Sequence, residues 1–154
     1  MLSEVKLLDV LNTIAQSTGS PPQSLKTLSY SERFTDHLVN PRNAGELADA
    51  DAVAEETNPV CGDRLRLSLR IRNGRIEAAR FLAYGCPPTL ACGSALAGMI
   101  EGLSIEDAFK LTRTAITEAV GGLPARKQHS AALAIEALRT AIEKFANADR
   151  LETE

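Results

Sequence analysis

Tryptophan is absent from this 154-residue chain, and aromatic residues make up only 4% of it. The core must therefore be built from leucine, isoleucine, valine and alanine, and the abundant alanine favours closely packed helices. The formal charge is −3 with neutral histidines, so the sequence lacks the basic excess that marks a bulk nucleic-acid binder. No apolar run approaches the roughly 18 residues that a membrane-spanning helix needs, which excludes such a helix.

Cysteine is also scarce. Three cysteines are an odd number and too few for a disulfide framework, so each is a core residue, a metal ligand or a reactive thiol. The first residues mix acids with apolar side chains and show no small-residue cleavage site, so we predict no secretory signal and expect a cytoplasmic protein. The patterns GxSxG, HExxH and GxGxxG do not occur, so classical hydrolase or nucleotide chemistry is not supported.

The length suits one domain with a short appendage. We predict an N-terminal helix and linker over residues 1–29, a domain over 30–148 and a C-terminal tail over 149–154. Apolar residues recur near the helical period over 3–16. The segment that follows contains Pro21 and Pro22, which is typical of a linker.

A β-hairpin is the clearest local signal. Leucine and isoleucine alternate with arginine over 64–72, which predicts a half-buried strand with one basic face in water. Asn73-Gly74 is the preferred two-residue turn, and a return strand is expected over 75–84. The apolar positions of that strand change parity, which predicts a bulge near Ala78–Ala79. Residues 46–58 are expected to hold an edge strand.

Helices are expected before and after the hairpin. A helix over 31–39 would begin at Ser31 as N-cap, with His37 exposed to solvent. Three further helices are predicted, over Pro87 to Glu101, Ser104 to Glu118 and Arg126 to Ala148. Strands followed by helices indicate an α+β fold: a small antiparallel sheet of about three strands covered on one face by helices, with a long C-terminal helix.

Metal-competent side chains flank the hairpin. Cys61 and Asp63 precede its first strand and are two residues apart, so both can face one site. Cys86 follows the return strand, and the far ends of a hairpin lie together. His129, near the start of the last helix, could reach the same corner. Two thiolates, a carboxylate and an imidazole suit a tetrahedral Zn²⁺ site or iron bound by mixed ligands.

Other interpretations of these residues stay open. A cysteine in a strand-rich region is often a small buried hydrophobic residue, and no CxxC motif fixes the set. Cys92 follows Cys86 by six positions, and six helical residues rotate by about 240°, so we expect Cys92 in the core. Ser130, Cys92 and Lys127 are auxiliary candidates beside the four main ones.

Several longer motifs are more specific. They are Tyr30-Ser-Glu-Arg-Phe-Thr-Asp-His-Leu-Val-Asn-Pro-Arg-Asn-Ala-Gly45, Asn58-Pro-Val-Cys-Gly-Asp63, Arg80-Phe-Leu-Ala-Tyr-Gly-Cys86 and Lys127-Gln-His-Ser-Ala-Ala-Leu-Ala134. In order and spacing, over about residues 30–146, the chain resembles the IscU/NifU-type iron–sulfur cluster scaffold family. The resemblance implies an α+β scaffold without enzymatic activity, on which a transient [2Fe–2S] cluster is built. Cys61, Asp63, Cys86 and His129 match the family's ligand positions.

The resemblance also implies partners. Sulfur would come from a cysteine desulfurase, and the cluster would pass to apo iron–sulfur acceptor proteins. Members of the family also bind Zn²⁺ at the empty site. The segment Leu123–Lys127 matches the family's chaperone-recognition run only in part, which leaves binding of an Hsp70-type chaperone open. Nothing predicts a nucleic-acid or membrane partner, and monomer and homo-oligomer both fit.

One departure from the family pattern concerns the site itself. The family's third cysteine directly follows the histidine, and here that position is Ser130. A serine hydroxyl stays protonated near neutral pH and is a poor ligand for iron. Two functions are therefore expected as alternatives: an iron–sulfur cluster scaffold or carrier, and a Zn- or Fe-binding module of the same fold that has lost full cluster assembly. Sulfur relay through Cys61 or Cys86 is a third.

Overall fold

The structure is a computed structural model that describes residues 30–153. The helix expected over 3–16 and its linker lie outside this part of the chain. The elements follow in the order α3 (Glu32–Val39), β1 (Ala52–Thr57), β2 (Arg64–Arg72), β3 (Arg75–Tyr84), α4 (Pro87–Ile100), α5 (Ile105–Phe109), α6 (Arg113–Ala119), a 3₁₀ turn (Ala125–Lys127) and α7 (Gln128–Thr153). The α+β class is confirmed. Among the described residues, no helix has the length and apolar character needed to cross a membrane.

The three strands form one antiparallel sheet in the order β1-β2-β3. Asn73 and Gly74 both have positive φ, 53° and 73°, as the predicted tight turn requires. The register shifts between Arg70 and Ile71, so that Glu77 is the extra residue on β3. The bulge therefore lies one residue before the predicted pair, because placing exposed Glu77 there returns Ala79 to the buried face.

The two faces of β2 differ as its alternation predicts. Its aliphatic residues are buried, and these are Leu65, Leu67, Leu69 and Ile71. Three of the four arginines of β2 contact acids of the segment 46–51, which leads into β1: Arg66 pairs with Glu46, Arg70 with Asp49 and Arg72 with Asp51, while Arg64 lies 3.8 Å from Glu55 on β1. The basic face is thus paired largely within the chain.

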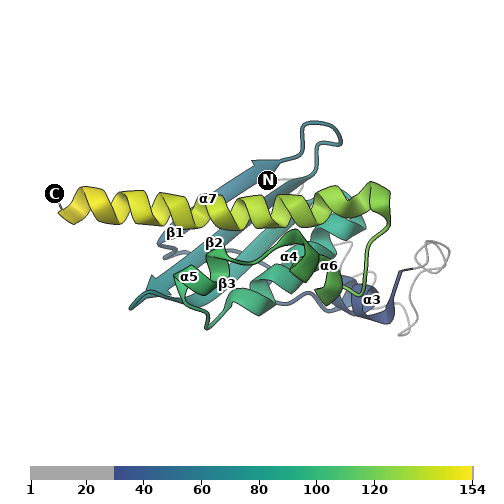
Figure 1. Cartoon of the computed structure of the whole chain (residues 1–154), viewed down its shortest axis with the longest axis horizontal. Coiled ribbons are helices and arrows are strands. Elements are labelled where there is room, and N and C mark those ends of the chain that lie inside the picture. The colour runs from purple at the N-terminus through teal and green to yellow at the C-terminus, as the bar shows by residue number, and fades with distance from the viewer. Residues whose placement is uncertain (1–29, 154) are drawn as a thin grey trace.

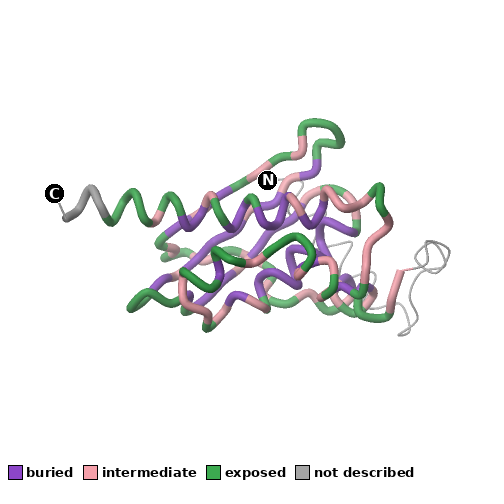
Figure 2. The backbone as a smooth tube through the Cα atoms, viewed as in Figure 1, coloured by how far each residue is buried: buried purple, intermediate pink, exposed green. Residues whose placement is uncertain are grey.

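Helices α4 and α7 cover the other face of the sheet and enclose the core (Figures 1 and 2). Helix α4 lies very close to the strands, because a Cβ at Gly93 would come within 2.6 Å of the Phe81 ring and 2.9 Å of the Leu65 side chain. The C-terminal part of α7 extends past the edge of the sheet, and Phe145 on it is only partly buried (Figure 1).

The single helix expected over Ser104–Glu118 is wrong: the chain forms α5 and α6. The predicted cap at Ser104 is present, and its side chain accepts from the N–H of Asp107. Thr112, however, adopts an extended conformation and accepts from the N–H of Ala115 through its side chain. A second N-cap inside the segment ends one helix and begins another.

Helix α3 begins as predicted, with the Ser31 side chain accepting from the N–H of Phe34. His37 differs from the expectation of full exposure. It is half-buried, and its Nδ1 lies 2.8 Å from the hydroxyl of the fully buried Ser94 on α4. The Ser94 oxygen also accepts from the N–H of Arg42, so this side chain links α3 and the segment after it to α4.

Candidate metal centre

Three segments that are distant in sequence meet at one end of the sheet. The turn between β1 and β2 holds Cys61, and Asp63 follows it directly before β2. The pairing of Arg64 with Tyr84 places the start of β2 beside the end of β3, where Cys86 forms the N-cap of α4. His129 lies in the first turn of α7. The far ends of the hairpin therefore meet as the turn geometry predicts.

The loop that holds Cys61 is organised by Asn58. The Asn58 side-chain oxygen accepts from the N–H groups of Val60 and Cys61, at 2.8 and 3.3 Å. Its carbonyl accepts from the N–H of Gly62, and its own N–H donates to Asp63. Cys61 is exposed, and Val60 beside it is 94% exposed. The first thiol is thus held by an ordered backbone yet open to the outside.

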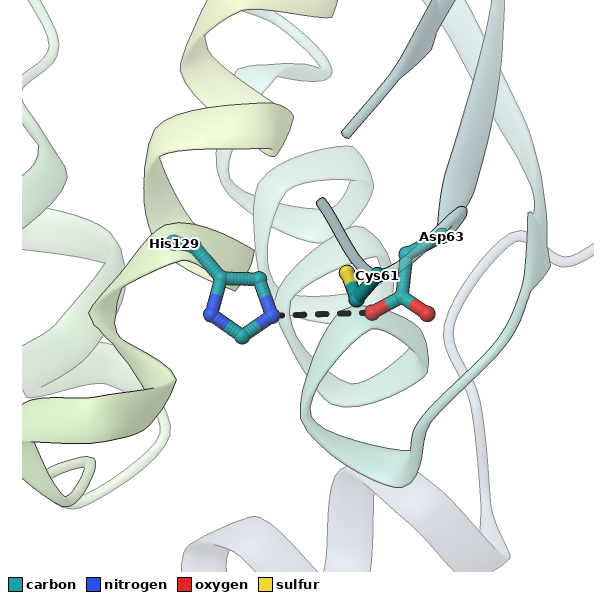
Figure 3. Close-up of side chains that lie close together, drawn as sticks. All are labelled: Cys61, Asp63 and His129. Carbon is teal, nitrogen blue, oxygen red and sulfur yellow. Dashed lines mark ion pairs between the residues drawn. The ribbon is translucent and has the colours of Figure 1, made fainter. Parts of the chain in front are cut away.

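Cys61, Asp63 and His129 point toward one another (Figure 3). Each offers one ligand atom, and these atoms all lie within 4.8 Å of one another. The Nε2 of His129 is 3.6 Å from Oδ2 of Asp63. A sulfur, a carboxylate oxygen and an imidazole nitrogen at this spacing are a donor set that zinc and iron accept.

The hydrogen bonds of His129 fix which nitrogen is free. Its Nδ1 lies 3.2 Å from the carbonyl oxygen of Arg126, and since a carbonyl only accepts, Nδ1 carries the proton. Nε2 is buried and has no hydrogen-bond partner within the described chain. An imidazole anchored through one nitrogen, with the lone pair of the other aimed into a site, is the arrangement found in metal-binding histidines.

Cys86 joins the group through Asp63. Its thiol donates to Oδ2 of Asp63 at 2.9 Å, and its backbone N–H donates to Oδ1 at 3.3 Å. The compact group of three does not include Cys86. The fourth candidate, Cys86, is thus linked to the group by its hydrogen bond to Oδ2 of Asp63, the oxygen that also faces His129.

Asp63 is the hub of the centre and is only 4% exposed. Burial by itself raises the pKa of this carboxyl, but hydrogen bonds from Cys86, Thr89 and Cys61 and from the backbone of Cys86 together hold it below its usual value. The group is therefore ionised at neutral pH. An anionic carboxylate beside a free imidazole nitrogen attracts a cation.

The auxiliary candidates lie in different surroundings. Cys92 is fully buried in α4, and burial together with the nearby Cys86 raises the pKa of its thiol to about 12, so it is a core residue as predicted. Lys127 ends the 3₁₀ turn, where its backbone N–H donates to the carbonyl of Pro124. Ser130 is fully buried, with Oγ 3.9 Å from the Cys86 sulfur.

Thr89 is the site residue that sequence reasoning missed. It is 1% exposed, and its hydroxyl donates to Oδ2 of Asp63 at 2.8 Å. Its oxygen also lies 3.2 Å from Oγ of Ser130. One signal could have indicated it: Thr89 is the polar residue in the first turn of a largely apolar helix, three positions after Cys86.

Comparison with known proteins agrees with this architecture. The family model of the NifU-like N terminal domain matches residues 29–151. The chain is 45% identical over 116 residues to iron–sulfur cluster assembly scaffold protein IscU 1 of Archaeoglobus fulgidus, covering 75% of this chain and 76% of that protein. It is 35% identical to the IscU scaffold protein of Haemophilus influenzae, covering 77% and 96%.

Solved structures show the same fold. The N-terminal NifU-like protein of Brucella abortus aligns with a TM-score of 0.62 at 20% identity, over 76% of this chain and 94% of that one. A structure from Fervidobacterium islandicum aligns with a TM-score of 0.63 at 19% identity, over 73% and 96%. The chain belongs to the NifU-like N-terminal domain family, the group that the motifs of the sequence indicated.

Proposed function

We propose that this protein is an iron–sulfur cluster assembly scaffold that binds iron and a transient [2Fe–2S] cluster as its cargo and passes the cluster to acceptor proteins. The observation that carries the proposal is the group formed by Cys61, Asp63 and His129, whose ligand atoms lie within 4.8 Å of one another, with the Cys86 thiol on the same carboxylate. Relatives that cover most of the chain are named as scaffold proteins of cluster assembly.

The geometry suits a cargo that arrives and leaves. Cys61 lies on an exposed turn, whereas Asp63 and Thr89 are buried. A carboxylate oxygen is a harder and weaker partner for a cluster iron than a thiolate, so it provides a bond that an acceptor can displace. Sulfur would come from a cysteine desulfurase at the persulfide level and be reduced to sulfide by a thiol reductant, and the chain acts as a scaffold rather than as an enzyme.

The second candidate is a module that holds one Zn²⁺ or iron ion at the same residues without building a cluster. Ser130 favours it, because a buried hydroxyl stands beside Cys86 where a third thiolate would strengthen cluster binding. Two cysteines, one carboxylate and one imidazole complete a four-coordinate site for a single ion.

Anaerobic reconstitution tests the proposal. The apo chain is incubated with ferrous iron, cysteine, a desulfurase and a thiol reductant, and visible absorption, iron and sulfide are measured. A scaffold shows [2Fe–2S] bands that are lost in Cys61→Ala and Cys86→Ala and kept in Cys92→Ala, the matched control thiol outside the site. Colourless protein that holds about one Zn²⁺ per chain, with four ligands of this kind, would instead establish the single-ion module.

A further inference from the structure

Two buried hydroxyl groups stand behind the candidate ligands. Thr89 lies in the first turn of α4 and Ser130 in the first turn of α7, and they are 1% and 0% exposed. Burying a hydroxyl costs free energy unless it is hydrogen-bonded, so each must have a partner. The Thr89 oxygen is 2.8 Å from Oδ2 of Asp63 and 3.2 Å from Oγ of Ser130. Asp63, Thr89 and Ser130 therefore form one continuous chain of hydrogen bonds.

The direction of these hydrogen bonds follows from their chemistry. An ionised carboxylate only accepts, so Thr89 donates its single hydroxyl proton to Asp63. The Thr89 oxygen then has lone pairs but no further proton for Ser130. Ser130 is therefore the donor in the second contact, and the chain of donation runs from Ser130 through Thr89 to Asp63. A donor that itself accepts a hydrogen bond is polarised and donates more strongly.

Metal loading changes the other donors to Asp63. The Cys86 thiol donates to the same Oδ2 at 2.9 Å, but a cysteine binds metal as a thiolate and then has no proton to give. The same loss applies to the Cys61 thiol. Of the side-chain donors described for Asp63, only the Thr89 hydroxyl keeps its proton when both cysteines become ligands. The backbone N–H of Cys86 continues to hold Oδ1.

We propose that Thr89 is the positioning residue that keeps the Asp63 carboxylate in place as a metal ligand when Cys61 and Cys86 lose their protons, and that Ser130 acts through Thr89 and not as a ligand. This inference rests on the metal site of the proposed function. It gives Ser130 a task that needs a hydroxyl, since a thiol at this position is a weak donor.

The test is a Co²⁺ titration of the reduced full chain without oxygen, followed by visible absorption. Thr89→Val keeps the shape of the side chain and removes the donor, and we expect it to weaken Co²⁺ binding roughly 10- to 100-fold, as loss of an outer partner of a ligand does. The thiolate charge-transfer bands stay while the ligand-field bands change, because the oxygen ligand is displaced and the sulfur ligands are not. Thr89→Ser restores binding.

A double-mutant cycle tests the part assigned to Ser130. Ser130→Ala weakens Co²⁺ binding less than Thr89→Val does, and adding Ser130→Ala to Thr89→Val causes no further loss, because Ser130 has nothing left to act through. Thr140→Val is the matched control: the Thr140 hydroxyl donates to Glu56 at 2.7 Å, on a different part of α7, and its loss leaves Co²⁺ binding unchanged.

Each outcome decides a separate point. Wild-type affinity and spectrum in Thr89→Val, or in Thr89→Ala should the valine variant fail to fold, would overturn the role of Thr89. Additive losses would show that Ser130 acts on the metal directly. A wild-type chain that binds no Co²⁺ would refute the metal site itself and with it the proposed function. Unchanged Co²⁺ binding in the Thr89 variants would refute only the role of Thr89 and would not affect the proposed function.

Discussion

The carboxylate of Asp63 fills the space in which a side chain at Gly85 would begin, because a Cβ at Gly85 would lie 2.0 Å from Oδ1 of Asp63. Gly85 also has φ +133°, a conformation that residues with side chains rarely adopt. The Asp63 carboxylate thus packs directly against the backbone of Gly85, next to Cys86, and this close contact requires glycine at position 85.

Gly85→Ala should therefore destabilise the fold and displace Asp63. We expect a loss of about 1–3 kcal/mol from backbone strain alone, and metal binding weakened at least about tenfold by the displaced ligand. Chemical denaturation and Co²⁺ titration measure the two effects. Gly45→Ala is the matched control, because Gly45 has φ +129° but open space around its Cβ, so it should lose stability and keep its metal affinity. Equal metal affinity in both variants would contradict the prediction.

Asp63→Ala should have opposite effects on a dication and on a cluster. Removing a buried negative ligand weakens Co²⁺ binding by more than the roughly 10- to 100-fold that the loss of an outer partner causes. A [2Fe–2S] cluster bound by thiolates carries excess negative charge, and losing the displaceable oxygen ligand should lengthen its lifetime several-fold. The decay of visible absorption in the presence of an apo acceptor measures that lifetime. Asp63→Asn removes the charge and keeps the shape, so it separates the two causes. An unchanged lifetime in both variants would exclude Asp63 as the labile ligand.

Ser130→Cys should raise the iron and sulfide content after reconstitution, because it places a third sulfur beside that of Cys86, where the serine oxygen now lies 3.9 Å away. Iron and sulfide analysis per chain gives the result. Ser130→Ala is the control, since it removes the hydroxyl without adding a thiol. A content no higher than that of the unaltered chain would show that a thiol at position 130 does not reach the cluster.

His37 should make the fold weaker in mild acid. Burial first, and the Arg42 charge second, lower the pKa of His37 below its ordinary value of 6.5, although Asp36 opposes them. Below pH 6.5 the unfolded chain therefore binds a proton before the folded chain does, so the free energy of unfolding falls as the pH drops from 6.5 through the folded pKa. Denaturation curves at several pH values measure this.

His37→Gln tests the assignment, because it leaves His129 as the remaining histidine of the chain. The variant should lose part of the pH dependence below 6.5. A slope identical to that of the unaltered protein would assign the acid sensitivity to other groups.

Local sequence patterns predicted most of the fold. The alternation over 64–72 and the Asn73-Gly74 turn predict the hairpin, since side-chain period and turn geometry are local properties. The caps at Ser31 and Ser104 are local in the same sense. The division between α5 and α6 was missed because Thr112 is acceptable both inside a helix and as a cap, and the extended conformation it adopts decides between them.

The candidate ligands could be named from the sequence because cysteine, aspartate and histidine are common metal ligands, and here they lie at the ends of a hairpin and of a helix. That they bind a cluster stays a prediction. His37 was expected in solvent because a histidine between an acid and a leucine shows no sign of its partner, and Ser94 belongs to another helix.

The sequence by itself determined the class of fold and the family and indicated the candidate metal ligands, because periodicity, turn residues and motif spacing are local properties of the chain. Only the tertiary structure decided how those residues are supported. Thr89, Ser130 and Asp63 come from three separate segments, and their contacts of 2.8 and 3.2 Å form because α4 and α7 pack beside the end of the sheet. Contacts of that kind depend on distance between elements and not on sequence spacing, so no pattern along the chain could have predicted them.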